Sequence, residues 1–110
     1  QQCQQLYHSW GIRIPDINCS YLTSAVGVVY GTSQKLAIRK EILQAVSEQY
    51  GVSVSAVDSG IRRMIDQLEA KPAEGWTQFK AESGFEAEKP TTGKLIYAIK
   101  RYLIQQKSRE

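Results

Sequence analysis

The stretch that decides the fold is residues 51–65, which read GVSVSAVDSGIRRMI. Its first half alternates Val and Ser as a strand does, but the alternation lasts for only four residues. Apolar residues then recur at steps of four, three, one and three, as one helical stripe and without the period of two that a strand requires: Val57, Ile61, Met64, Ile65 and Leu68. We therefore predict a helix over about residues 55–70, with Ser53 or Ser55 as its N-cap.

The rest of the chain shows the same helical spacing. Further helices are predicted over about residues 2–10, 19–30, 35–50 and 73–83, with a last helix that begins at a Thr91 or Thr92 cap. The side chains expected to face the core are Trp10, Leu22, Ala25, Val26, Val29, Tyr30, Leu36, Ile38, Ile42, Leu43, Val46, Trp76, Phe79, Leu95, Ile96, Ile99, Tyr102 and Leu103. The prediction is an all-α fold, a compact six-helix domain that occupies residues 1–110.

Composition limits the classes of function. The chain has 110 residues and a formal net charge of +3, and the whole excess lies after residue 34, where thirteen Lys and Arg face ten Asp and Glu. Such a small surplus permits an anionic partner without requiring one. No apolar run approaches the roughly 20 residues that a membrane span needs, and the start lacks the features of a signal peptide. We expect a cytoplasmic protein with no membrane partner.

The sequence offers no set of groups for catalysis or for metal binding. Two Cys and one His do not supply four zinc ligands, and Cys3 and Cys19 are expected to be free, buried thiols in a reducing cytosol, although a disulfide between them is possible in principle. His8 has no nucleophile or carboxylate arranged around it in the sequence. We therefore expect a protein that is not an enzyme and has no cofactor.

Two helices joined by a tight turn at Gly51 form a helix-turn-helix outline over about residues 35–70. Gly51 suits a turn that needs a positive φ, and Val52 is expected to fill the angle between the helices. The face of the second helix that points away from the core then carries residues able to reach base edges in the major groove: Ser55, Ala56, Asp58, Ser59, Arg62 and Arg63.

Basic and hydroxyl residues near two other helices are candidates for contacts with DNA phosphates. They are Lys35, Arg39, Lys40, Lys89, Thr91 and Lys94, and Lys100 and Arg101 follow in the last helix. An alternative is open, because residues 53–70 hold two Arg against Asp58, Asp66 and Glu69. Arg62 then only forms an i,i+4 pair with Asp58 or Asp66, and the domain is a helical module that binds a protein partner such as a sigma factor.

Three segments, in this order, resemble a known family. They are SYLTSAVGVVYGT (20–32), SEQYGVSVSAVDSGIRRMID (47–66) and EKPTTGKLIYAIKRYL (88–103). Together they resemble the C-terminal DNA-binding effector domain of the stage-zero sporulation response regulators of endospore-forming Firmicutes, over roughly residues 6–104. The resemblance implies a six-helix domain that binds duplex DNA in the major groove, with dimerisation controlled by a phosphorylatable receiver domain. No such domain is visible in this chain, so the Gln-rich start is expected to be the tail of a linker.

The resemblance also assigns roles to single residues. It implies that Ser55 caps the recognition helix, that Asp58 is an acidic base reader and that Arg62 faces DNA, whereas Arg63 replaces a His of the family. The family typically has Arg where this chain has Ala56 and Ser59, and those Arg are its main guanine readers. Each lost Arg removes about 1–3 kcal/mol of base discrimination, so the family's target sequence is not expected to carry over.

Overall fold

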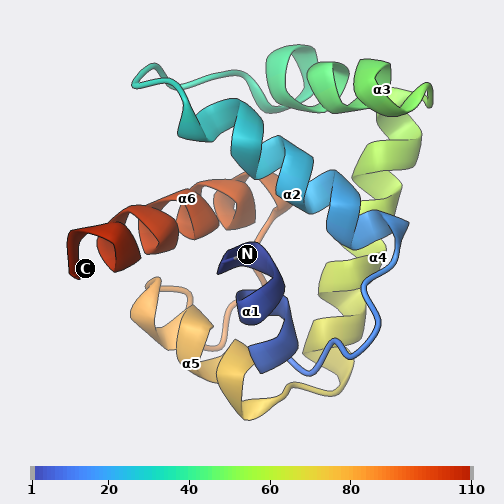
Figure 1. The fold of residues 1–110 in the computed structure, drawn as a ribbon. Coiled ribbons are helices and arrows are strands. Elements are labelled where there is room, and N and C mark those ends of the chain that lie inside the picture. Colours follow the sequence, from blue (N-terminus) through green and yellow to red (C-terminus); the bar gives the residue numbers. More distant parts are fainter. Residues whose placement is uncertain (1, 110) are drawn as a thin grey trace.

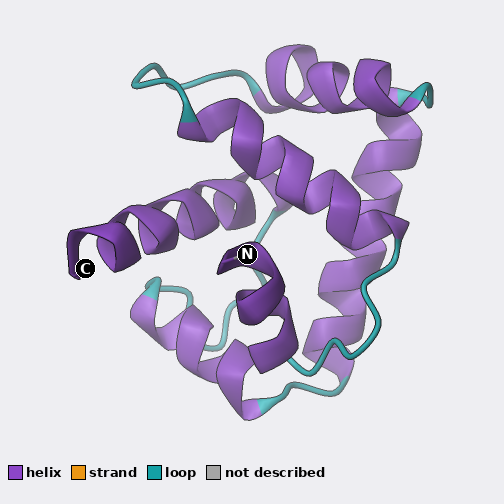
Figure 2. Cartoon of the chain, viewed as in Figure 1, coloured by secondary structure: helices purple, strands orange, loops and turns teal. Residues whose placement is uncertain are grey.

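The computed structural model describes residues 2–109, and these residues form helices and loops without a strand (Figure 2). The elements are α1 (Gln2–Ser9), α2 (Ile17–Tyr30), η1 (Ile38–Leu43), α3 (Gln44–Tyr50), α4 (Val54–Ala70), α5 (Glu74–Glu82) and α6 (Thr92–Arg109). η1 is a π-helical stretch that runs directly into α3. The predicted all-α class with six α-helices is therefore confirmed.

Helix α2 is the centre of the packing. It contacts α4, α6 and α3, and Figure 1 shows it passing between α3 and the pair formed by α1 and α5. Its apolar side chains Leu22, Ala25 and Val29 are fully buried. Burial of apolar surface is the main favourable term in folding, so these α2 contacts hold the other helices in place.

The apolar stripe over residues 57–68 forms the inner face of α4. Val57, Ile61, Met64, Ile65 and Leu68 are all buried, as predicted. On the far side of the core, Trp10 from the turn after α1 packs edge-on against Trp76 of α5, with ring centroids 4.8 Å apart. This aromatic contact joins the turn after α1 to α5, and Phe79 of α5 in turn packs against Tyr102 of α6.

Two core predictions are wrong. Tyr30 is 40% exposed because it is the last residue of α2 and its side chain extends beyond the core. Val52 is 36% exposed, so it does not fill the angle between α3 and α4. Leu36, Ile38 and Tyr102 are only partly buried, and they pack against the edge of the core.

Two helices begin at other residues than predicted, and side-chain hydrogen bonds explain both differences. Asp16 caps α2 by accepting from the backbone N–H groups of Asn18 and Cys19 at 3.0 and 3.2 Å, so α2 begins at Ile17 rather than near residue 19. The predicted helix over 35–50 begins only at Ile38. The backbone N–H of Leu36 instead donates to the Tyr97 hydroxyl of α6 at 2.8 Å, and this bond holds the segment extended.

A partly buried polar cluster joins α4 and α5. Glu69 Oε2 accepts hydrogen bonds from Trp76 Nε1 at 2.8 Å and from Lys80 Nζ at 2.7 Å. Burial by itself raises the pKa of the Glu69 carboxyl, but the hydrogen bonds from Lys80 and Trp76 and the charges of Lys80 and Lys89 outweigh it, so its pKa lies below the ordinary value.

The two cysteines are free and buried, as predicted. Burial is the main cause that raises the pKa of the Cys3 and Cys19 thiols above the ordinary value. Since the thiolate is the reactive form, both sulfurs behave as small apolar groups of the core.

Candidate nucleic-acid interface

The connection between α3 and α4 is tightly built. Gly51 ends α3 in the left-handed conformation at φ 68°, and its N–H, like that of Val52, donates to the Ser47 carbonyl. Ser53 begins α4, and its hydroxyl accepts from the Ala56 N–H at 3.0 Å. The turn therefore has a capped helix end on each side, which fixes the angle at which α4 leaves α3.

Ser53, and not Ser55, is the cap of α4. The resemblance assigned that role to Ser55, and this assignment is wrong because Ser55 already lies within the first turn of the helix. The Ser53 backbone is extended, at φ −77° and ψ 157°, which is the conformation that an N-cap residue needs.

Most of the predicted base-facing residues share one exposed face of α4. Ser55, Ala56, Ser59, Arg62 and Arg63 are all exposed, and the Arg62 side chain is 70% exposed. These positions lie opposite the buried stripe of α4. Nothing from the described residues covers this face, so it is free to approach another molecule.

Asp58 differs from its neighbours because its side chain is only 13% exposed. Its carboxylate pairs with Arg39 of η1 at 3.1 Å and with Arg62 one turn along α4 at 3.2 Å. Oδ1 also lies 3.4 Å from the Thr92 hydroxyl at the start of α6. Asp58 thus connects three elements at one point and orients two guanidinium groups.

Five of the six predicted phosphate contacts fall into two groups, one on η1 and one around the start of α6. Arg39 and Lys40 lie on η1, and both are exposed. Thr91 caps α6 by accepting from the Lys94 N–H at 3.2 Å, and Lys89 pairs with Asp66 of α4. Lys89 and Thr91, together with Arg62, line a small cleft of about 310 Å³ between α4 and the start of α6.

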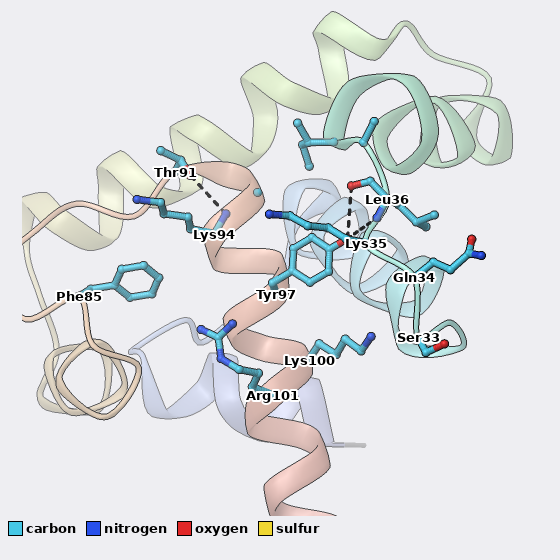
Figure 3. Close-up of a pocket in the computed structure, with 13 residues that line it drawn as sticks. Ser33, Gln34, Lys35, Leu36, Phe85, Thr91, Lys94, Tyr97, Lys100 and Arg101 are labelled. Carbon is cyan, nitrogen blue, oxygen red and sulfur yellow. Dashed lines mark hydrogen bonds between the residues drawn. The ribbon is translucent and has the colours of Figure 1, made fainter.

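Lys35 was predicted to lie in the first turn of a helix, and this prediction is wrong. It lies in the extended segment before η1. This placement brings it to a second, larger cleft that it lines together with Thr91 and Lys94 (Figure 3). Two further lining residues, Phe85 and Tyr97, were not singled out as functional from the sequence. The available signal was the spacing of three between Lys94, Tyr97 and Lys100, which places them on one side of α6.

The described residues contain no group of three or more His, Cys, Asp or Glu side chains placed to hold a metal ion. None of their helices is both long enough and apolar enough to cross a bilayer.

Comparison of the chain with models of protein families, with curated proteins and with solved structures finds no significant match.

Proposed function

We propose that this domain binds duplex DNA, with α4 lying in the major groove, and that it serves a bacterial transcriptional regulator of the sporulation response-regulator type. The observation that supports this most is the free outer face of α4 directly after a tight, doubly capped turn. A helix in this setting presents its first turns to base edges while the preceding helix lies near the backbone.

The contacts of Asp58 give this proposal its geometry. Because Arg39 of η1 and Thr92 of α6 both meet the Asp58 carboxylate, both elements lie beside the first turns of α4. The candidate phosphate contacts on η1 and α6 are therefore next to the base-facing residues. Such contacts set the register of a protein on DNA, and the groove-facing side chains read the sequence.

In this proposal Asp58 acts through its neighbours. Its carboxylate holds Arg62 and Arg39, so we assign it the positioning of these two side chains in place of the base contact implied by the resemblance. Arg62 and Arg63 are then the main base readers, and Ser59 and Ala56 face the groove one and two turns earlier in α4. Arg suits guanine because its guanidinium donates to both O6 and N7.

The test is selection of bound duplexes from a random pool, followed by fluorescence anisotropy on the enriched sequence. Arg62→Ala is expected to weaken binding by about 1–3 kcal/mol and to relax one base position. Lys107→Ala is the matched control, because Lys107 is an exposed cation near the other end of α6. Unchanged affinity of the Arg62→Ala variant, or an equal loss in the control, would remove Arg62 from the interface.

Salt dependence separates this function from its rival. Five of the six candidate phosphate residues are cations, and five contacts predict a slope of log K against log salt of about −4.5. A helical protein-interaction module is the second candidate. It is favoured by the neutralisation of cations next to α4, where Arg39 and Arg62 pair with Asp58 and Lys89 pairs with Asp66. No DNA binding at low salt would select this second function.

The family resemblance adds further partners to the proposal. They are an N-terminal receiver domain and a second copy of the domain on DNA, whereas a sigma factor of RNA polymerase is the partner in the protein-interaction alternative. An enriched motif with two half-sites would support the dimer, because half-site spacing reflects the symmetry of the bound protein.

A further inference from the structure

The larger of the two clefts described above has the dimensions of a small-molecule site. Its volume is about 730 Å³, and it lies between residues 33–38 and α6, with Phe85 on its other side (Figure 3). Pockets that bind small molecules commonly have about 300–1,000 Å³ and combine apolar walls with a few polar groups. This cleft has both kinds of lining.

The wall between residues 33–38 and α6 is fixed by hydrogen bonds across the sequence. The Tyr97 hydroxyl accepts from the Leu36 N–H at 2.8 Å and donates to the Leu36 carbonyl at 3.3 Å. Lys100 Nζ donates to the Thr32 carbonyl at 2.7 Å. The cleft is therefore preformed, which lowers the entropy cost of binding.

The charge of the lining has one sign. Lys35, Lys94, Lys100 and Arg101 all line the cleft, and its lining contains no carboxylate. The only ion pair that the described residues give to any of these four is that between Lys94 and Glu88, at 4.0 Å. The lining therefore attracts a compact group with more than one negative charge, such as a phosphate chain.

The apolar part of the lining favours a flat group. Figure 3 shows the Phe85 ring on one side of the opening and the Tyr97 ring on the α6 side, with Arg101 below them. Both side chains are only partly buried, so parts of them are open to a ligand. Aromatic rings and a guanidinium both favour contact with another aromatic plane.

We propose that this cleft binds a nucleoside phosphate. The base contacts Phe85 and Tyr97, and the phosphates pair with Lys35, Lys94 and Arg101. This inference does not depend on DNA binding, since Phe85, Tyr97 and Arg101 are separate from the outer face of α4. It has a regulatory consequence, because Lys35 and Lys94 are also candidate phosphate contacts for DNA and a bound nucleotide competes for them.

The experiment is a titration of the intact chain with ADP, followed by calorimetry and by NMR chemical shifts, in the absence of DNA. ADP is expected to shift the ring signals of Phe85 and Tyr97. Adenosine and inorganic pyrophosphate are each expected to bind at least tenfold more weakly than ADP, because each lacks one half of the recognised structure. Absence of shifts at millimolar ADP, or equal binding of pyrophosphate, would overturn the proposal.

Two variants sharpen the result. Arg101→Ala removes an exposed cation from the cleft and is expected to weaken ADP binding by tenfold or more, whereas Lys107→Ala outside the cleft leaves it unchanged. Phe85→Ala is expected to weaken ADP but not pyrophosphate, with circular dichroism to confirm folding. If Phe85→Ala does not fold, the Arg101 result alone decides.

A single-stranded trinucleotide that displaces ADP would assign the cleft to a nucleic-acid strand and overturn the small-molecule assignment.

Discussion

At the scale of single residues, Asp58 is the position where stability and the candidate interface meet. Its carboxylate contacts Arg39, Arg62 and Thr92 from three elements. Asp58→Asn keeps the shape but removes the charge, and we expect it to lower the free energy of unfolding by about 1–3 kcal/mol. Urea denaturation measures this loss. Asp66→Asn is the control, since Asp66 is 59% exposed and its surface pair with Lys89 is worth below about 1 kcal/mol.

Glu69 provides a pH-dependent prediction. The pKa of the Glu69 carboxyl is lowered in the folded protein. Its contribution to the free energy of unfolding is therefore fully present above the unfolded pKa of about 4.3, and it is lost as the pH falls through the lower folded pKa. Glu69→Gln is expected to destabilise the protein by about 1–2 kcal/mol at pH 7, because it leaves the buried Lys80 ammonium without its partner charge.

The measurement is the free energy of unfolding of both proteins at pH 7, 5 and 3. The difference between wild type and Glu69→Gln should shrink toward the acid end, where Glu69 itself becomes neutral. Glu82→Gln changes an exposed carboxylate of the neighbouring helix α5 and should show a small, nearly constant difference. If the difference in free energy of unfolding between wild type and Glu69→Gln stays constant with pH, the stabilising role of the Glu69 charge is contradicted.

At the scale of elements, the start of α4 shows which of two serines is the N-cap, a choice that the sequence left open between Ser53 and Ser55. The Ser53 hydroxyl accepts from the Ala56 N–H, whereas Ser55 is exposed within the first turn. Ser53→Ala is expected to cost about 1 kcal/mol of stability, and Ser55→Ala close to zero or a slight gain. Thermal unfolding of the two variants compares them directly, and the reverse order would return the cap to Ser55.

Periodicity predicted the helices well because burial acts on one face of each. The inner residues Leu95, Ile96 and Ile99 of α6 were found in this way, and all are fully buried. Periodicity is silent about hydrogen bonds from distant side chains, so it missed that Tyr97 holds the segment before η1 extended. It also does not tell Ser53 from Ser55, since both precede the same apolar stripe.

The candidate interface was only partly predictable. The exposed residues of α4 follow from the stripe on its opposite face, and the exposure of Arg62 and Arg63 needed no further information. The engagement of Asp58 required three elements to meet, and the larger cleft required residues 33–38 to lie against α6. Neither arrangement leaves a local pattern in the sequence.

At the scale of the whole molecule, the packing of α1 on α5 requires a glycine at position 75. A Cβ at Gly75 would meet the backbone carbonyl of Ser9, whereas a Cβ at Gly27 would meet nothing within 4 Å. Both glycines are in helices, where alanine is normally better by about 0.5–1 kcal/mol. Gly27→Ala should therefore raise the melting temperature.

Gly75→Ala should lower the melting temperature despite the better helix propensity, because α1 must shift away from α5 by overpacking that costs about 1–3 kcal/mol. Tryptophan fluorescence reports the same event, since Trp10 and Trp76 lie at this contact. If both alanine variants gain stability, the close approach of α1 and α5 is not required.

The hydrogen bonds from α6 to the segment before η1 also delay the completion of folding during synthesis. Leu36 precedes its partner Tyr97 by 61 residues, and Thr32 precedes Lys100 by 68. While the ribosome is still translating the middle of the chain, α6 does not yet exist. The segment before η1 and the side of α2 that packs against α6 are then uncovered. Long-range contacts of this kind are slow to form, so we expect the final fold to form only when the last helix emerges.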